Sequence, residues 1–170
     1  SLFALPPAID PMTGDLTFAA PNNANGVSTV LACLKDTGGG TDTTCKTFSI
    51  MVMAVNQPPT ATLPPSVRVG QNSGLHQVQY FLTNVMPGPS NENTQVITSV
   101  TCTMASVSQA LFAAQPVIVL GTYTLSFSPA IDAVGSAVVT VTLTDNGGRA
   151  NGGMDTNAFT FTIEIIGVNQ

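Results

Sequence analysis

The chain repeats part of itself, and the two copies differ in completeness. Residues 1–57 match residues 110–170, and each copy ends in Val-Asn-Gln, starting at Val55 and at Val168. Further upstream, "VLACLKDTGG" matches "VTVTLTDNGG", and "FSIMV" matches "FTIEI". Nothing else in the chain matches residues 58–109. We therefore expect one complete repeat at 58–170, and only the C-terminal half of a repeat at 1–57.

The complete repeat has the pattern of an antiparallel β-protein. Near its end, Phe161 and Ile163 alternate with Thr162 and Glu164, so one face of that strand is apolar and the other polar. Turn signals separate about seven such segments, which is typical of a sandwich of two sheets. The sequence predicts an all-β sandwich at 58–170 and an incomplete half-domain at 1–57, completed in trans. The expected strands are 60–69, 75–83, 94–104, 115–119, 122–128, 136–145 and 157–166.

The composition argues against several kinds of partner. Charged residues make up 8% of the chain, and the four basic ones are scattered along it. So few cations cannot neutralise a row of phosphates, which predicts no nucleic-acid binding. No apolar run is long enough to span a bilayer, which predicts no membrane insertion. Low charge with many β-branched residues favours an extracellular protein.

The quoted segments carry a resemblance to a known family. "PAID", "LTF", "NANG", "TFSI" and "VNQPP" in the first copy, with "LTDNGGRANGGMDT" in the second, resemble the Ig-like or cadherin-like tandem repeats of large bacterial surface proteins. The resemblance implies an Ig-like sandwich at the cell surface, with no enzyme chemistry and no cofactor. Calcium-dependent relatives place carboxylates at the repeat junction, where this chain has Asn56-Gln57 and Asn169-Gln170. Neutral amides supply little of the charge that hard cations need, so no junction calcium is implied.

Half a sandwich leaves its core face uncovered. Several hundred Å² of apolar surface in water costs on the order of 10 kcal/mol, which is comparable with the stability of a whole domain. One explanation is that the chain is a fragment of a tandem-repeat adhesin or stalk, with the missing strands elsewhere in the gene product. The other is that a second copy lends the strands, as in pilus assembly, which would give a homopolymer. We expect a non-catalytic subunit of an extracellular, pilus-like fibre.

Two sets of apolar residues are candidates for the assembly interface. On the outward positions of the first copy, Leu31, Met51 and Met53 stand where the second copy has Thr140, Glu164 and Ile166. At the N-terminus, "SLFALPPAI" is short and uncharged, so it could serve as a donor strand. The alternative is an ordinary mid-domain loop, as expected at 110–116 in the second copy. The donor residues are Leu2, Phe3 and Leu5.

The three cysteines fall into two groups. Cys33 and Cys45 lie on the two expected strands of one hairpin with the same parity, so a disulfide between them is predicted, with two free thiols as the alternative. Cys102 shares its parity with Val100 and Met104, which predicts a buried thiol acting as a small hydrophobe. A link between molecules is the other interpretation of Cys102.

The remaining candidate sites have ordinary structural alternatives. Asp145 and Asp155 bracket "DNGGRANGGMD" and are candidate calcium ligands, although Asp-Asn-Gly-Gly is also a common tight turn. His76 is the single histidine, and no nucleophile-elbow motif accompanies it. We therefore predict no catalytic residues and no cofactor. The sequence does not identify any glycan or other ligand.

Overall fold

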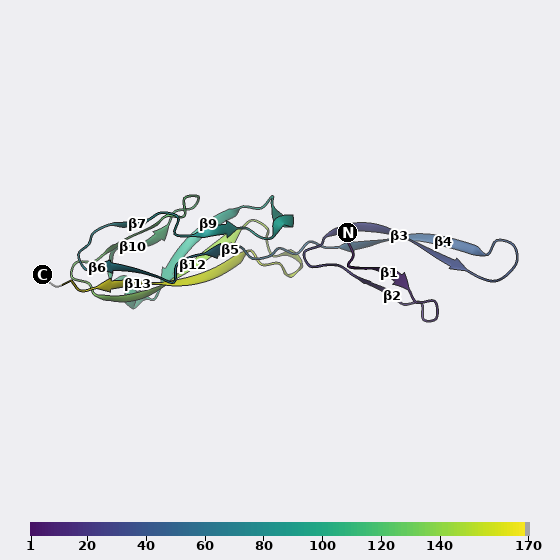
Figure 1. Cartoon of the computed structure of the whole chain (residues 1–170), viewed down its shortest axis with the longest axis horizontal. Helices are drawn as coiled ribbons and strands as arrows, with labels where there is room; N and C mark the ends of the chain where they lie inside the picture. Colours follow the sequence, from purple (N-terminus) through teal and green to yellow (C-terminus); the bar gives the residue numbers. More distant parts are fainter. Residues whose placement is uncertain (169–170) are drawn as a thin grey trace. The chain divides into compact units, whose positions relative to one another are not determined.

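The structure is a computed structural model that describes residues 1–168, so Asn169 and Gln170 lie outside the described residues. The chain divides into two compact units, Ser1–Val55 (unit 1) and Asn56–Gln170 (unit 2), where the sequence predicted a boundary after Gln57. Both units are built from β-strands (Figure 1). Within the described residues, no helix is long and apolar enough to cross a membrane.

Unit 2 is a β-sandwich. One sheet has the strand order β6–β13–β12–β9 and the other the order β10–β11–β7, while β5 and β8 form a separate pair. All neighbours are antiparallel except β6, which runs parallel to β13. The bounds are β5 (Thr60–Thr62), β6 (Ser66–Gly70), β7 (His76–Val78), β8 (Thr83–Met86), β9 (Ile97–Met104), β10 (Phe112–Ile118), β11 (Leu125–Pro129), β12 (Gly135–Asp145) and β13 (Thr156–Ile166), with single helical turns at Ser90–Glu92, Ser106–Gln109 and Ala150–Gly152.

The core of unit 2 lies between its two sheets. From Ala137 on β12 and from Phe161 to Ile165 on β13 every second side chain is buried, because a strand turns successive side chains to opposite faces. Phe127 of the facing sheet is fully buried as well. The core residues are Val69, Phe81, Leu82, Phe112, Ile118, Leu125, Phe127, Ala137, Val139, Val141, Leu143, Phe161, Ile163 and Ile165.

Two expected strands of unit 2 are interrupted. The segment expected at 60–69 breaks into β5 and β6 around Pro64-Pro65, because proline has no N–H to donate to a ladder. The segment expected at 75–83 ends early at β7, and Tyr80 adopts a positive φ of 52° in the following turn. Regular pairing stops at such a residue, since positive φ is incompatible with an extended strand.

Unit 1 consists of two hairpins. Strand β1 (Leu5–Ile9) pairs with β2 (Leu16–Ala19), and β3 (Gly26–Lys35) pairs with β4 (Thr43–Val52). Each hairpin is a two-stranded sheet of its own, and Figure 1 shows them diverging from each other. The carboxylate of Asp10 fixes the first turn by accepting a hydrogen bond of 2.7 Å from the Met12 N–H.

The pairing in unit 1 has the same register as the corresponding pairing in unit 2. Strands β1, β2, β3 and β4 occupy the positions of β10, β11, β12 and β13. Unit 1 therefore has the geometry of half of unit 2. The matching pairs are Ile9–Leu16 with Ile118–Leu125, Gly26–Val52 with Gly135–Ile165, Val30–Phe48 with Val139–Phe161, and Cys33–Cys45 with Thr142–Ala158.

Candidate assembly site: the open face of unit 1

An apolar groove of about 590 Å³ runs between the two hairpins of unit 1. We call it the inner groove. One wall comes from β1, β2 and their turn, and the other from β3 and the start of β4. Its inner-face side chains correspond to core positions of unit 2. The lining residues are Pro7, Ile9, Pro11, Leu16, Val30, Leu31, Ala32, Cys33, Leu34, Thr44 and Lys46.

Equivalent residues have opposite environments in the two units. Leu125 and Phe127 of β11 are 0% exposed, whereas their counterparts Leu16 and Phe18 are 39% and 42% exposed. Leu143 of β12 is 0% exposed, and its counterpart Leu34 is 78% exposed. The residue type is the same or similar in each case, so the difference arises from missing cover and not from sequence.

Unit 2 shows which neighbouring strands unit 1 lacks. In unit 2, β9 lies beside β12, β6 beside β13 and β7 beside β11. Among residues 1–168, no strand occupies the equivalent place beside β3, β4 or β2. These three edges carry backbone N–H and C=O groups that a further strand could pair with.

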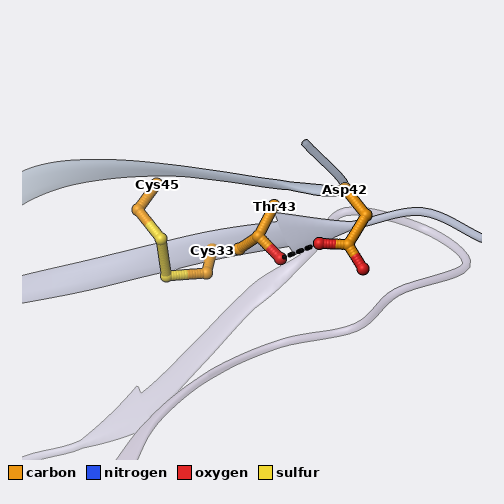
Figure 2. Close-up of a disulfide and its surroundings, with 4 residues drawn as sticks. All are labelled: Cys33, Asp42, Thr43 and Cys45. Atoms are coloured by element: carbon orange, nitrogen blue, oxygen red, sulfur yellow. Dashed lines mark hydrogen bonds between the residues drawn. A yellow bond between two sulfur atoms is a disulfide. The ribbon is translucent and has the colours of Figure 1, made fainter. Parts of the chain in front are cut away.

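A disulfide cross-links the two strands of the hairpin that forms one wall of the inner groove. Cys33 and Cys45 are directly opposite in the β3–β4 register, and they are joined by a disulfide (Figure 2). Beyond it toward the turn, the Thr43 hydroxyl donates a 3.1 Å hydrogen bond to the Asp42 carboxylate. Disulfides persist in oxidising compartments, so this bond points to an extracellular protein.

The two sets of predicted interface residues lie in different surroundings. Leu31, Met51 and Met53 are exposed, and Val27, cross-strand from Met51, extends this outer apolar patch. The N-terminal residues instead pack against other residues of unit 1. Leu5 starts β1, which pairs with β2 of the same chain.

Leu2 and Phe3 are half-buried within unit 1. Leu2 lies against Gly26, where an added Cβ would be 3.6 Å from the Leu2 Cδ1. The ring of Phe3 meets that of Phe18 edge-on, with 5.7 Å between the ring centroids. The N-terminal segment thus occupies the place that β10 has in unit 2, and part of it forms strand β1 where the alternative interpretation expected a loop.

Lys46 gives the inner groove a positive charge. The other three basic side chains each pair with a carboxylate: Lys35 with Asp42, Arg68 with Glu164, and Arg149 with Asp155. Lys46 has no such ion pair in the described part of the chain. The equivalent position in unit 2 is held by Phe159, which packs against the core. Covering Lys46 without a counter-charge is costly, because a desolvated ammonium needs a partner.

The two candidate calcium ligands, Asp145 and Asp155, each contact different partners. Asp145 is buried and accepts hydrogen bonds from the Asn56 side-chain amide at 3.0 Å and the Gly147 N–H at 2.8 Å. Asp155 pairs with Arg149 at 2.6 Å. Within residues 1–168, no three His, Cys, Asp or Glu side chains gather as a metal site.

Asn56 has an anchoring role in unit 2 that sequence reasoning missed. Its side-chain amide also donates a hydrogen bond to the Met154 backbone carbonyl at 2.8 Å. The backbone carbonyl of Asn56 accepts one from the Met154 N–H at 3.0 Å. Next to it, the Gln57 N–H donates to buried Glu92 at 3.1 Å. These contacts anchor the start of unit 2. The signal in the sequence was the repeated Val-Asn-Gln itself.

His76 contacts a nearby serine and a core phenylalanine. Its Nε2 lies 2.7 Å from the Ser73 hydroxyl, which donates its proton to the Gly70 carbonyl. The ring stacks on buried Phe127 at 5.4 Å between centroids.

Cys102 is partly buried on β9. Desolvation by burial raises the pKa of its thiol to about 11, partly opposed by a hydrogen bond with the backbone of Ile118. The thiolate is the reactive form of cysteine, so this residue is unreactive near neutral pH.

Comparison with known proteins gives weak structural likeness. No protein-family model and no curated protein matches the chain. Among solved structures, the chain is similar to the ectodomain of human desmocollin-1, with a TM-score of 0.40 and 12% sequence identity. The match covers 96% of this chain and 32% of that one, so the chain spans about a third of the ectodomain.

Proposed function

We propose that the chain is a non-catalytic structural subunit of an extracellular fibre or stalk at the cell surface, and that strands from outside its own fold complete unit 1. The observation that carries the proposal is the exposure of unit 1's core positions. Leu16, Phe18 and Leu34 lie open to solvent, while the same positions in unit 2 are fully buried. A surface of this kind is covered in the working protein, since large exposed apolar patches mark interaction sites.

In the first candidate arrangement, neighbouring protomers lend strands to each other. The contact is head-to-tail, so it propagates into a pilus-like filament where the geometry does not close. The outer apolar patch supports assembly as well, because Val27, Met51 and Met53 are exposed and do not line the inner groove. This arrangement makes the chain its own partner.

A second candidate, a tandem-repeat surface adhesin or stalk, is favoured by two observations. Each chain carries only one copy of residues 58–109, and its strands already close unit 2. The N-terminal segment is also engaged, as β1 paired with β2. In this arrangement, a further half-repeat of the same polypeptide supplies the strands.

Light scattering and negative-stain microscopy of the 170-residue chain separate the two arrangements. Complementation between protomers predicts filaments or concentration-dependent oligomers that Leu34→Asp abolishes. A stalk predicts a monomer whose unit 1 exchanges amide hydrogens rapidly. As a matched control, Thr140→Asp changes the outer face of unit 2 and leaves assembly intact. A monomer whose β2, β3 and β4 amides are all strongly protected contradicts both candidates, because unit 1 is then closed by itself.

A further inference from the structure

The free edge of β3 has a partner whose chemistry can be specified. We propose that this edge accepts an antiparallel strand of the β9 type, and that the strand carries a carboxylate opposite Ala32 that pairs with Lys46. The inference rests on the proposed function, since it names the strand that completes unit 1 at this edge. Three observations lead to it: the register of β9 in unit 2, the exposed side chains of β3, and the charge of the inner groove.

The register of the incoming strand follows from unit 2. There β9 pairs antiparallel with β12, with Met104, Cys102 and Val100 opposite Val139, Val141 and Leu143. The corresponding residues of β3 are Val30, Ala32 and Leu34. A strand in the same place therefore presents alternate side chains beside these three residues. Its pattern is apolar at every second position, because only the inward side chains meet the groove.

The middle position differs from a copy of β9. Lys46 is directly opposite Ala32 across the β3–β4 hairpin, and Ala32 carries only a methyl group. The incoming residue lies on the other side of Ala32, about 10 Å from Lys46, or two strand spacings away. The four-carbon stem of a lysine and the side chain of a glutamate together bridge that distance over the small alanine. An acidic residue there gives Lys46 the counter-charge that the described residues do not supply.

A synthetic peptide tests the proposal against the full chain. The probe is the decapeptide Val96–Ala105 with Cys102→Glu, and its neutral match carries Cys102→Gln. We expect the glutamate peptide to bind and to slow amide exchange along Gly26–Lys35, the β3 strand, and not along the outer edge of β4. The glutamine peptide is expected to bind ~2–5-fold more weakly, as for a solvent-exposed ion pair. With Lys46→Met in the chain, that preference disappears while both peptides still bind.

Leu34→Asp in the chain is expected to abolish binding of both peptides, because it places a charge in the groove. The proposal is overturned if neither peptide binds up to about 1 mM, if protection appears on β4 alone, or if Lys46→Met leaves the preference for glutamate unchanged. The proposed function is judged separately by the assembly state. Filaments that Leu34→Asp abolishes, without any peptide binding, would sustain the function and refute this choice of strand.

Discussion

At the scale of single residues, the decisive feature is that identical side chains have different surroundings in the two units. Leu16 and Leu125 occupy the same register position, yet only Leu125 is enclosed. Sequence pattern identifies which face of a strand is apolar, but it cannot report whether another strand covers that face. Burial here depends on neighbours that are far away in the sequence.

The Cys102 thiol is predicted to be inert in the folded chain. Its pKa of about 11 leaves almost no thiolate at pH 8, so a maleimide should label native protein far more slowly than protein unfolded in urea. Burial raises the folded-state pKa above the value of 9.0 for an unperturbed cysteine. The contribution of the neutral Cys102 thiol to folding stability is therefore fully present below about pH 9 and is lost as the pH rises toward 11. Rapid labelling of the native chain at pH 7 would show that β9 is open.

Asn56 is predicted to stabilise unit 2 through its side-chain amide. Asn56→Ala removes hydrogen bonds to Asp145 and to the Met154 carbonyl, and leaves the buried Asp145 carboxylate less satisfied. We expect the free energy of unfolding to fall by about 1–3 kcal/mol, measured by urea denaturation of unit 2. Asn93→Ala, at an exposed position, is the matched control and should cost less than about 0.5 kcal/mol. If both substitutions lower the free energy of unfolding equally, Asn56 does not anchor unit 2.

At the scale of elements, the disulfide marks the hairpin that lacks neighbours. In unit 2, β12 is held by β13 on one side and β9 on the other, and the equivalent pair Thr142–Ala158 needs no covalent link. In unit 1, β3 has only β4, and Cys33–Cys45 joins them. An isolated two-stranded hairpin is marginal in water. The bond thus helps to hold β3 and β4 in register without a third strand.

Removing the disulfide is predicted to loosen unit 1 alone. A cross-link that closes a loop of this size contributes about 3 kcal/mol, chiefly by restricting the unfolded chain. In the Cys33→Ser, Cys45→Ser double variant, amide exchange along β3 and β4 should speed up markedly, while exchange along β12 and β13 stays the same. Adding a reductant to the wild-type chain should reproduce the effect. Unchanged exchange in β3 would mean that packing, not the bond, holds the hairpin.

Most strands were predictable from alternation, and the breaks were less so. The expected segments 136–145 and 157–166 lie within one residue of β12 and β13, because long alternating runs carry a strong signal. The break of the expected segment 60–69 at Pro64-Pro65 follows from proline chemistry. The alternation pattern alone did not predict it. Lys46 could be assigned to the inner face by parity. That it has no counter-charge depends on the absence of a neighbouring strand, which no local pattern reports.

At the scale of the whole molecule, the two units differ in what holds them together. Unit 2 encloses a continuous core between two sheets, and its stability follows from burying that core. Unit 1 has the same strands and register but only one of its large apolar side chains, Ile50, is buried. Cooperative unfolding requires a shared core, so unit 1 cannot contribute a sharp transition of its own until it is completed.

We therefore predict that the isolated chain unfolds in a single cooperative transition that belongs to unit 2. In monomeric conditions, calorimetry should show an enthalpy appropriate to about 115 residues and not to the full chain, since enthalpy scales with the residues that fold cooperatively. Amides of β3 and β4 should exchange much faster than those of β12 and β13. When strands are supplied, by assembly or by the β9-type peptide, protection should extend into β3 and the enthalpy should rise. A monomer with full-length enthalpy and equal protection in both units would mean that unit 1 needs no partner, because two hairpins with an open face would then be stable alone.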